Sequence, residues 1–460
     1  MKTALKCSIL LFGLNLTACS LIPEYVQPIS PAPANYPATQ EADNLSMPNS
    51  WQQYFIDPEL QRFIKASLKN NRDYKISVLR IEEARAQYGI QRSDTLPTIN
   101  GTADYERSRT LLSGGQSSKA SLYRVGLGMS NFELDLFGRV KSLSNAALEE
   151  YFATEEAQQT TRTSLIAEVA VNYLNVRSLT ERLRITQETM LSREVGLARI
   201  NRRFSAGIDT TIDLKTAELQ LETVRASLAA LKREQLQAMN TLNLLVGDQT
   251  MKLAASESLA TLKFSALPVG VPSDLIERRP DIRAAEHRLK AANANIGAAK
   301  AAFFPRIQLT TNIGLISNSF SQLFSGGADQ SWSFAPQLTI PIFNYSRNQS
   351  NLDLVKVRKN IAIAEYEKVI QTAFSEVSNI LVARMQLDKQ IEAQNKVFEV
   401  ERERLRLATR RYDSGIANYL ELLDAQRGMF DAEQVLVQLK QILLSNSINL
   451  FKVLGGEWEV

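Results

Sequence analysis

Long stretches of helical periodicity dominate the pattern of apolar and polar positions. No proline lies between Pro97 and Pro268 or after Pro341, so two long segments lack the residue that most strongly breaks a helix. The pattern predicts long helices at about 142–204 and 346–412, each followed by a glycine turn and a return helix of about forty residues. In the second return helix the apolar residues form two adjacent columns: Leu422, Met429, Leu436, Leu443 and Leu450, and Leu423, Phe430, Val437, Leu444 and Phe451. A stripe two columns wide packs on both sides, which suits a wall of helices.

Period-two alternation marks four shorter segments that we expect to be strands. Tyr123 and Val125 alternate with Arg124 and Gly126, and residues 306–313 alternate in the same way. The predicted strands lie in two pairs at about 98–109 and 121–137, and at about 305–317 and 331–343, each pair joined by a loop rich in glycine and serine. A helix precedes each pair, at about 59–92 and 273–302.

The chain repeats itself at an offset of 208 residues. At that offset RFSAGIDTTIDLKTA (203–217) aligns without a gap with RYDSGIANYLELLDA (411–425). Both copies have the same order of parts: helix, strand pair, long helix, glycine turn, helix. We therefore divide the chain into repeats at 59–250 and 268–456, with a linker at 251–267 and a short tail at 457–460.

Four strands per chain pose a closure problem. Alternating strands of about ten residues match the length that crosses an outer membrane when tilted. An open sheet in lipid leaves backbone groups unpaired at its edges, at several kcal/mol each, and the smallest known closed barrels have about eight strands. The expected fold class is therefore mainly α with a β-barrel part, to which several copies of the chain contribute strands.

The N-terminus has the layout of an export signal. Lys2 and Lys6 precede an apolar run that is too short to span a bilayer as a helix. The sequence LTAC at 16–19 resembles the lipobox of bacterial lipoproteins, which makes residues 1–18 a signal peptide and Cys19 a lipid anchor. Ser20 then favours delivery to the outer membrane by the lipoprotein pattern. The alternative is a fortuitous cysteine.

A proline-rich segment follows the cysteine. Residues 22–48 hold six of the fourteen prolines, so we expect 19–58 to be a lipidated N-terminus and an extended tether. The other thiol, Cys7, lies in the signal segment, which fits an oxidising compartment.

Charge and motifs exclude several classes of function. The formal net charge of +4 falls to +2 without Lys2 and Lys6, too close to neutral to predict a nucleic-acid partner. No Cys/His metal spacing, phosphate loop or GxSxG elbow occurs, and the single His287 lies on a predicted helix, where a structural role is the ordinary one. We predict no enzyme, no metal and no cofactor other than a covalent lipid on Cys19.

These features, together with YLELLDAQR (419–427) and SNFELDLFGR (130–139), resemble the TolC-type outer-membrane efflux proteins. The resemblance covers essentially the whole mature chain and is strongest to the lipoprotein branch found with drug pumps of the resistance, nodulation and division (RND) type. It implies a homotrimer whose twelve-stranded outer-membrane barrel continues into a periplasmic α-helical barrel. It also implies a passive exit duct of a tripartite multidrug pump, opened when a periplasmic adaptor protein and an inner-membrane RND-type transporter dock.

The same resemblance assigns candidate site residues. It places the turns around Gly207 and Gly415 at the periplasmic tip, and Asp424 and Glu421 at a ring of carboxylates that forms the gate. Like charges in a narrow mouth raise their own pKa values and favour cations. Capping is the alternative for Glu421, which has the spacing of an N3 partner to Asn418. For Asp424, the alternative is a surface ion pair with Arg427 at i+3.

Basic pairs end both outgoing helices. Arg410 and Arg411, like Arg202 and Arg203, suit the helix dipole there. A sharper hypothesis is that Arg410 or Arg411 forms salt bridges with acids of a neighbouring helix and holds the tip shut. Two other functions stay open at this point: the outer component of a protein-secretion system, and a non-conducting structural lipoprotein of the envelope.

Overall fold

The computed structural model describes residues 20–33, 35–36, 48, 50–111, 117–253, 259, 262–267 and 279–456. Cys19, the predicted signal peptide 1–18 and the tail 457–460 lie outside these residues. The prediction of a mainly helical chain with a smaller β part is confirmed. The chain divides into two compact units: unit 1 comprises Met1–Ile29, Arg80–Glu155 and Ala284–Glu367, and unit 2 comprises Ser30–Leu79, Glu156–Arg283 and Lys368–Val460.

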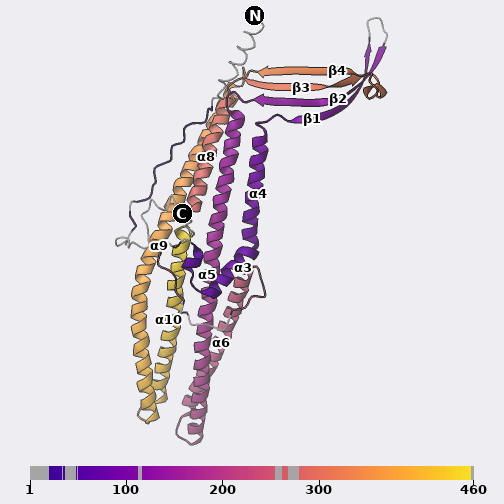
Figure 1. Ribbon diagram of the computed structural model, residues 1–460. Coiled ribbons are helices and arrows are strands. Elements are labelled where there is room, and N and C mark those ends of the chain that lie inside the picture. The colour runs from indigo at the N-terminus through magenta and orange to yellow at the C-terminus, as the bar shows by residue number, and fades with distance from the viewer. Residues whose placement is uncertain are drawn as a thin grey trace. The chain divides into compact units, whose positions relative to one another are not determined.

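The elements follow one another in the order predicted for two repeats (Figure 1). They are α2 (Trp51–Tyr54), α3 (Pro58–Asn70), α4 (Arg72–Ser93), β1 (Ile99–Leu111), β2 (Ser117–Leu134), α5 (Arg139–Ser205), α6 (Thr211–Val246), α8 (Pro280–Ala301), β3 (Arg306–Ser317), the 3-10 turn η2 (Ser321–Leu323), β4 (Asp329–Thr339), α9 (Tyr345–Asp413) and α10 (Tyr419–Val453). The two long helices, α5 and α9, have 67 and 69 residues.

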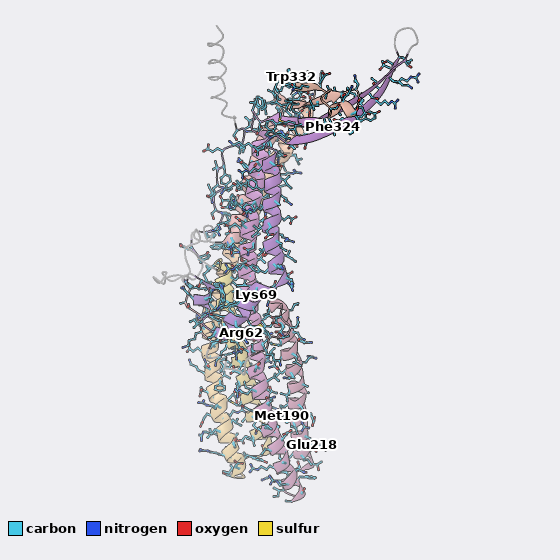
Figure 2. The ribbon with its side chains drawn as sticks, turned by 45° about the vertical axis from the view of Figure 1, so that its right-hand side comes forward. Arg62, Lys69, Met190, Glu218, Phe324 and Trp332 are labelled. Atoms are coloured by element: carbon cyan, nitrogen blue, oxygen red, sulfur yellow. The ribbon has the colours of Figure 1, made fainter. Side chains whose placement is uncertain are left out.

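The strands of unit 1 form one antiparallel sheet in the order β1-β2-β3-β4. Leu127 pairs with Ile313, and Ile313 pairs with Trp332, so these side chains share a face. They are 57%, 67% and 77% exposed, and Trp332 is marked on the sheet in Figure 2. The other face carries polar residues such as the ion-paired Arg124 and Glu106. One face of the sheet is therefore apolar and uncovered in the single chain.

The centre of the sheet joins the two repeats, because β2 and β3 come from different copies. Gly126 and Gly314 face each other there. A Cβ on Gly126 would lie 2.5 Å from the carbonyl oxygen of Ile313, so the opposing backbone occupies the space of a side chain. A β-bulge between Met129 and Phe132 then shifts the register, with Asn131 at φ 56°.

The core of unit 2 gathers segments that are far apart in sequence. Trp51, Tyr54, Phe63, Tyr173 and Phe451 are all at most 2% exposed and belong to one cluster. The aromatic ring of Tyr54 stacks on that of Phe451 at 5.0 Å. This cluster thus includes Trp51 and Tyr54, which lie inside the stretch 19–58 that we expected to be a tether.

The predicted linker 251–267 also contributes to this core. Leu259 and Leu262 are buried, Phe264 forms a β-bridge with Phe55, and the Ser265 backbone N–H donates to the carbonyl oxygen of Tyr54 at 3.2 Å. Residues 254–258 and 260–261 lie outside the described residues. The described part of the linker is packed structure.

The helix predicted at 59–92 is two helices, because Asn71 interrupts it. The backbone of Asn71 is extended, and the Asn71 Oδ1 accepts from the Tyr74 N–H at 2.9 Å, which caps α4. Its Nδ2 donates to the Leu245 carbonyl at 2.8 Å. No helix among the described residues combines the length and the apolar content needed to cross a membrane.

Candidate functional site

The two glycine turns are built identically. The Gly207 N–H donates to the Phe204 carbonyl and the Ile208 N–H to the Arg203 carbonyl, both at 2.9 Å. Gly415 and Ile416 make the equivalent bonds, at 3.0 and 2.9 Å. This pair of bonds is the Schellman motif, whose C′ residue adopts a left-handed conformation. Gly207 and Gly415 have φ angles of 71° and 75°, which explains glycine at both positions.

The return helices begin with different caps. Thr210 and Asp213 form a complete capping box at the start of α6. At the start of α10, the Asn418 side chain accepts from the Glu421 N–H at 3.0 Å, but the Glu421 carboxylate accepts from Arg411 Nε at 2.8 Å. Glu421 therefore occupies the N3 position while its charge is used across the turn, in an exposed ion pair between α9 and α10.

Asp424 is exposed and pairs with Arg404 of α9. The alternative partner from the sequence, Arg427, is wrong: its Nε donates to Gln220 Oε1 of α6 at 3.0 Å. The hydrogen bond to Asp424 raises the pKa of Arg404. Arg404 was not predicted from the sequence, although it and Asp424 lie at similar sequence distances before and after Gly415. Aligning the two helices of the hairpin outward from the Gly415 turn would have predicted this pair.

The arginines of the two basic pairs differ in their partners. Arg411 makes the ion pair with Glu421, whereas Arg410 makes none with the described residues. In the first repeat, Arg203 pairs with Asp209 at 2.9 Å, inside its own turn. The ion pair of Arg411 is thus present, and its role in holding a gate stays a prediction.

The outgoing helices of the two hairpins contact each other at this end of unit 2. Arg199 of α5 pairs with Asp413 of α9 at 2.6 Å, and its guanidinium lies 5.4 Å from the centre of the Tyr412 ring. Further along, Arg193 and Arg182 hydrogen-bond to Gln426 and Gln434 of α10, and burial lowers the pKa of both arginines.

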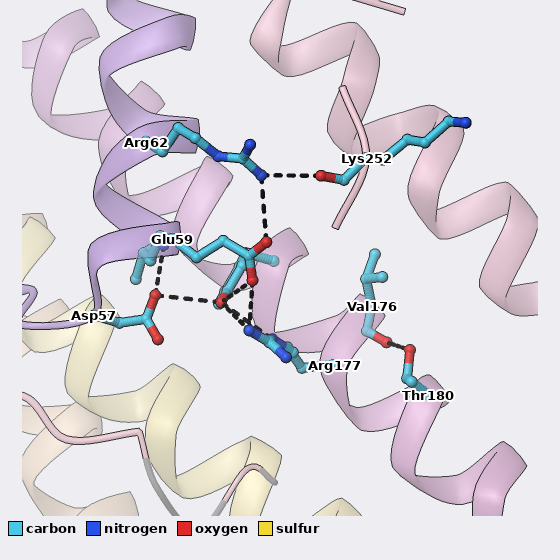
Figure 3. A network of polar contacts seen from close by, with 9 residues as sticks. Asp57, Glu59, Arg62, Val176, Arg177, Thr180 and Lys252 are labelled. Carbon is cyan, nitrogen blue, oxygen red and sulfur yellow. Dashed lines mark hydrogen bonds and ion pairs between the residues drawn. The ribbon is translucent and has the colours of Figure 1, made fainter. Parts of the chain in front are cut away.

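A buried polar network anchors α5 in the core of unit 2 (Figure 3). Arg177, 5% exposed, pairs with Glu59 of α3 at 2.5 Å. The Tyr173 hydroxyl lies 3.3 Å from both Asp57 Oδ1 and Glu59 Oε2. Arg62 extends the network to the carbonyl of Lys252 at 2.9 Å. This network links α5 to α3 and, through Arg62, to the chain at Lys252. It was not predicted from the sequence.

The single histidine lies in a contact between two helices. His287 Nδ1 lies 2.6 Å from Glu149 Oε2, between α8 and α5 of unit 1. Within the described ranges, no group of His, Cys, Asp and Glu side chains is arranged to hold a metal ion.

Comparisons with known proteins agree with this architecture. The profile of the family described as "Outer membrane efflux protein" matches twice, over residues 63–248 and 271–456. The chain is 43% identical to outer membrane protein OprJ of Pseudomonas aeruginosa, covering 100% of this chain and 97% of that protein. It is 42% identical to solvent efflux pump outer membrane protein SrpC of Pseudomonas putida, covering 97% of both.

Solved structures give the same result. The open state of the MtrE outer membrane channel of Neisseria gonorrhoeae superposes with a TM-score of 0.87 at 38% identity, covering 96% of this chain and 99% of that one. The resemblance predicted from the sequence is confirmed. The chain belongs to the outer membrane efflux protein family.

Proposed function

We propose that three copies of this chain form the outer-membrane exit channel of a tripartite efflux pump. The observation that carries the proposal is the sheet of unit 1. It has an uncovered apolar face and two open edges, β1 and β4. Membership of an outer-membrane family supports a lipid environment for that face.

The open edges argue for closure by further copies. In lipid, each unpaired backbone N–H or C=O costs several kcal/mol, so β1 of one copy must pair with β4 of the next. Three copies give twelve strands, enough to enclose a lumen.

Membership of the same family supports a proposal for the pump partners. A passive channel needs an energised transporter, so we assign an inner-membrane RND-type transporter and a periplasmic adaptor protein as partners. Small-molecule efflux is favoured over protein secretion because relatives such as SrpC are named as efflux pump components. A structural lipoprotein has no use for an uncovered apolar sheet.

We further propose that Cys19 carries the lipid. The segment that follows is compatible with this, because residues 22–25 lie against helix α8 of unit 1. Asn293 Nδ2 donates to the Pro23 carbonyl at 2.8 Å, and the Tyr25 hydroxyl donates to Glu286 at 3.2 Å. An anchor attached to this segment is held close to unit 1 and not on a free tether.

For the gate, we propose Asp424 and Glu421. Both are exposed on α10 near the Gly415 turn, and both are paired within the chain, with Arg404 and Arg411. Three copies would bring these pairs around one passage. In this conformation the arginines compensate the acids, so opening that separates α9 from α10 would expose carboxylates that favour cations.

Single-channel conductance of the purified full-length protein in planar bilayers tests both proposals. We expect discrete channels for the wild type, and a larger conductance or weaker cation preference for Asp424→Ala. Glu222→Gln is the matched control, since it removes an acid from an exposed intrahelical pair on α6. Absence of channels in every preparation would refute the duct. Identical behaviour of all variants would leave the duct and refute the gate.

A further inference from the structure

A groove on unit 1 is lined by arginine side chains. Helices α5, α8 and α9 and the start of β3 surround an open cavity of about 400 Å³. Its charged lining consists of Arg139, Arg288, Arg306 and Arg358 against one acid, Glu150, which leaves an excess of three positive charges.

Two acids offset part of this charge, Glu133 beside Arg139 and Glu150, whose carboxylate interacts with Arg288. Arg139 makes a bidentate pair with Glu133, with Nε–Oε1 at 2.8 Å and Nη2–Oε2 at 2.7 Å. The other three guanidinium groups make no ion pair with any residue in the described part of the chain. A guanidinium presents its donors as a planar fork that matches carboxylate, sulfonate and phosphate oxygens. Three such forks around a concave surface form a receptor for an anion.

The opposite face of α8 holds the N-terminal segment. Glu286, Lys290, Asn293 and Gly297 recur at helical spacing and contact residues 22–25. Gly297 has no space for a Cβ, which would lie 2.7 Å from the Ile22 side chain. The groove-lining residues of α8, at 288, 292, 295 and 299, lie half a turn away around the same helix. Segment and groove therefore occupy opposite sides of α8.

These two sides can be assigned if the chain is a channel. A lipid on Cys19 enters the bilayer that surrounds the channel, so the face of α8 that holds residues 22–25 is the outer face. The arginine groove then faces the lumen. This step rests on the proposed function, whereas the groove and its charge do not.

We propose that the arginine groove is an anion-binding site in the lumen, which holds the carboxylate, sulfonate or phosphate group of a small solute in transit. Its size suits a small molecule and excludes a folded protein. Because Arg288, Arg306 and Arg358 remain open to water, binding is reversible, as a passage requires. Three copies would place three such sites around one lumen, at the same level along its axis.

The test is a binding titration with the purified full-length protein in uncharged detergent. The probe is pyranine, a fluorescent trisulfonate, followed by fluorescence polarisation. Arg288→Gln/Arg358→Gln should raise the dissociation constant about tenfold or more, because two charge-assisted contacts are lost. The matched control is Lys300→Gln/Lys359→Gln, which removes the same charge from the same two helices at positions that do not line the groove. Equal weakening in both variants, or no saturable binding by the wild type, overturns the site.

Two further measurements separate the alternatives. Soluble glycerol phosphate should displace pyranine from the wild type. If phosphatidylglycerol micelles displace pyranine but glycerol phosphate does not, a lipid headgroup fills the groove. That result would overturn the proposal that the groove faces the lumen. In planar bilayers, pyranine should reduce the wild-type current. A conducting wild type that does not bind pyranine refutes the site and leaves the channel, whereas saturable binding without conduction refutes the channel and leaves the groove.

Discussion

The hairpins α5–α6 and α9–α10 share their turns and differ in their charges. Both turn through a Schellman motif on a left-handed glycine. In the second hairpin Arg404–Asp424 connects the two helices, whereas the equivalent positions of the first are Gly196 and Thr216. Arg203 keeps the place of Arg411 but pairs inside its own turn, with Asp209. The repeat has therefore kept the backbone that reverses the chain, while the side chains have diverged.

At one pair of equivalent positions the two hairpins carry opposite charges. Glu194 and Arg225 form an ion pair at 3.1 Å between α5 and α6. The equivalent residues of the second hairpin are Arg402 and Glu433, with both signs reversed. Arg402 pairs with Glu399 along its own helix, and burial raises the pKa of Glu433. Equivalent positions thus face different surroundings in the two hairpins.

The largest expected effect concerns the depth at which each long helix is anchored. Arg177 of α5 is 5% exposed, whereas its counterpart in α9, Met385, is 41% exposed. Arg177→Met should lower the free energy of unfolding of the helical region by roughly 3 kcal/mol, because the partly buried Glu59 carboxylate loses its guanidinium partner. Urea unfolding followed by circular dichroism measures this. Arg184→Met, which breaks an exposed pair on the same helix, is the control and should cost at most about 1 kcal/mol. Equal losses would contradict the anchoring role.

The second prediction tests whether the turns are equivalent. Gly207→Ala and Gly415→Ala should each lower the free energy of unfolding by about 1–2 kcal/mol, because a Cβ is strained at positive φ. Gly196→Ala, inside α5 with open space around it, should instead raise stability by up to about 1 kcal/mol. A cost at only one turn would show that the two hairpins differ in their backbones as well.

The third prediction concerns the pair present in one hairpin only. A double-mutant cycle with Arg404→Ala and Asp424→Ala should give a coupling of about 0.2–1 kcal/mol in the free energy of unfolding, as is usual for exposed pairs. Introducing Gly196→Arg and Thr216→Asp together should create a coupling of similar size in the first hairpin. If the transplanted pair shows no coupling, the two hairpins differ in helix spacing.

The smallest effect is a pH dependence. Burial raises the pKa of Glu433, with Arg184 of α5 opposing the shift and Glu188 and Glu181 adding to it. A raised pKa means that the folded chain binds more protons than the unfolded chain, so stability falls as the pH rises above about 4.5, the ordinary value. Glu433→Gln should flatten this decline in unfolding curves recorded from pH 4 to 8. Glu218→Gln, an exposed acid on α6 marked in Figure 2, controls for the loss of a carboxylate. A decline of equal slope in Glu433→Gln would refute the assignment.

Local signals in the sequence predicted much of this fold. Helical periodicity and the glycine turns placed α5, α9 and α10 within a few residues, and alternation located all four strands. The cap formed by Asn418 was predicted because capping depends on residues only three apart. The break at Asn71 was missed, since Asn71 keeps its extended backbone through a bond to Leu245 on another helix.

The candidate site was less predictable, because its contacts depend on how helices align. Asp424 was identified, but its partner Arg404 lies on the other helix of the hairpin. Residues 22–25 can pack on α8 because Gly297 has no side chain. A glycine inside a helix does not indicate from the sequence which segment packs against it. The sequence contains such partners without indicating which of them meet.

The stacking of Tyr54 on Phe451 constrains the order of events during biosynthesis. The Tyr54 hydroxyl donates to the carbonyl of Ser447 at 2.7 Å, a contact between residues 393 apart in sequence. An emerging chain presents Tyr54 long before the ribosome reaches α10, so the face of Tyr54 that stacks on Phe451 stays uncovered by it until the last helix is made. Long-range closure of this kind is slow. A polypeptide that ends before Ser447 would lack both contacts of Tyr54 with α10, so an unfinished copy would differ from a finished one in leaving this side of the core uncovered.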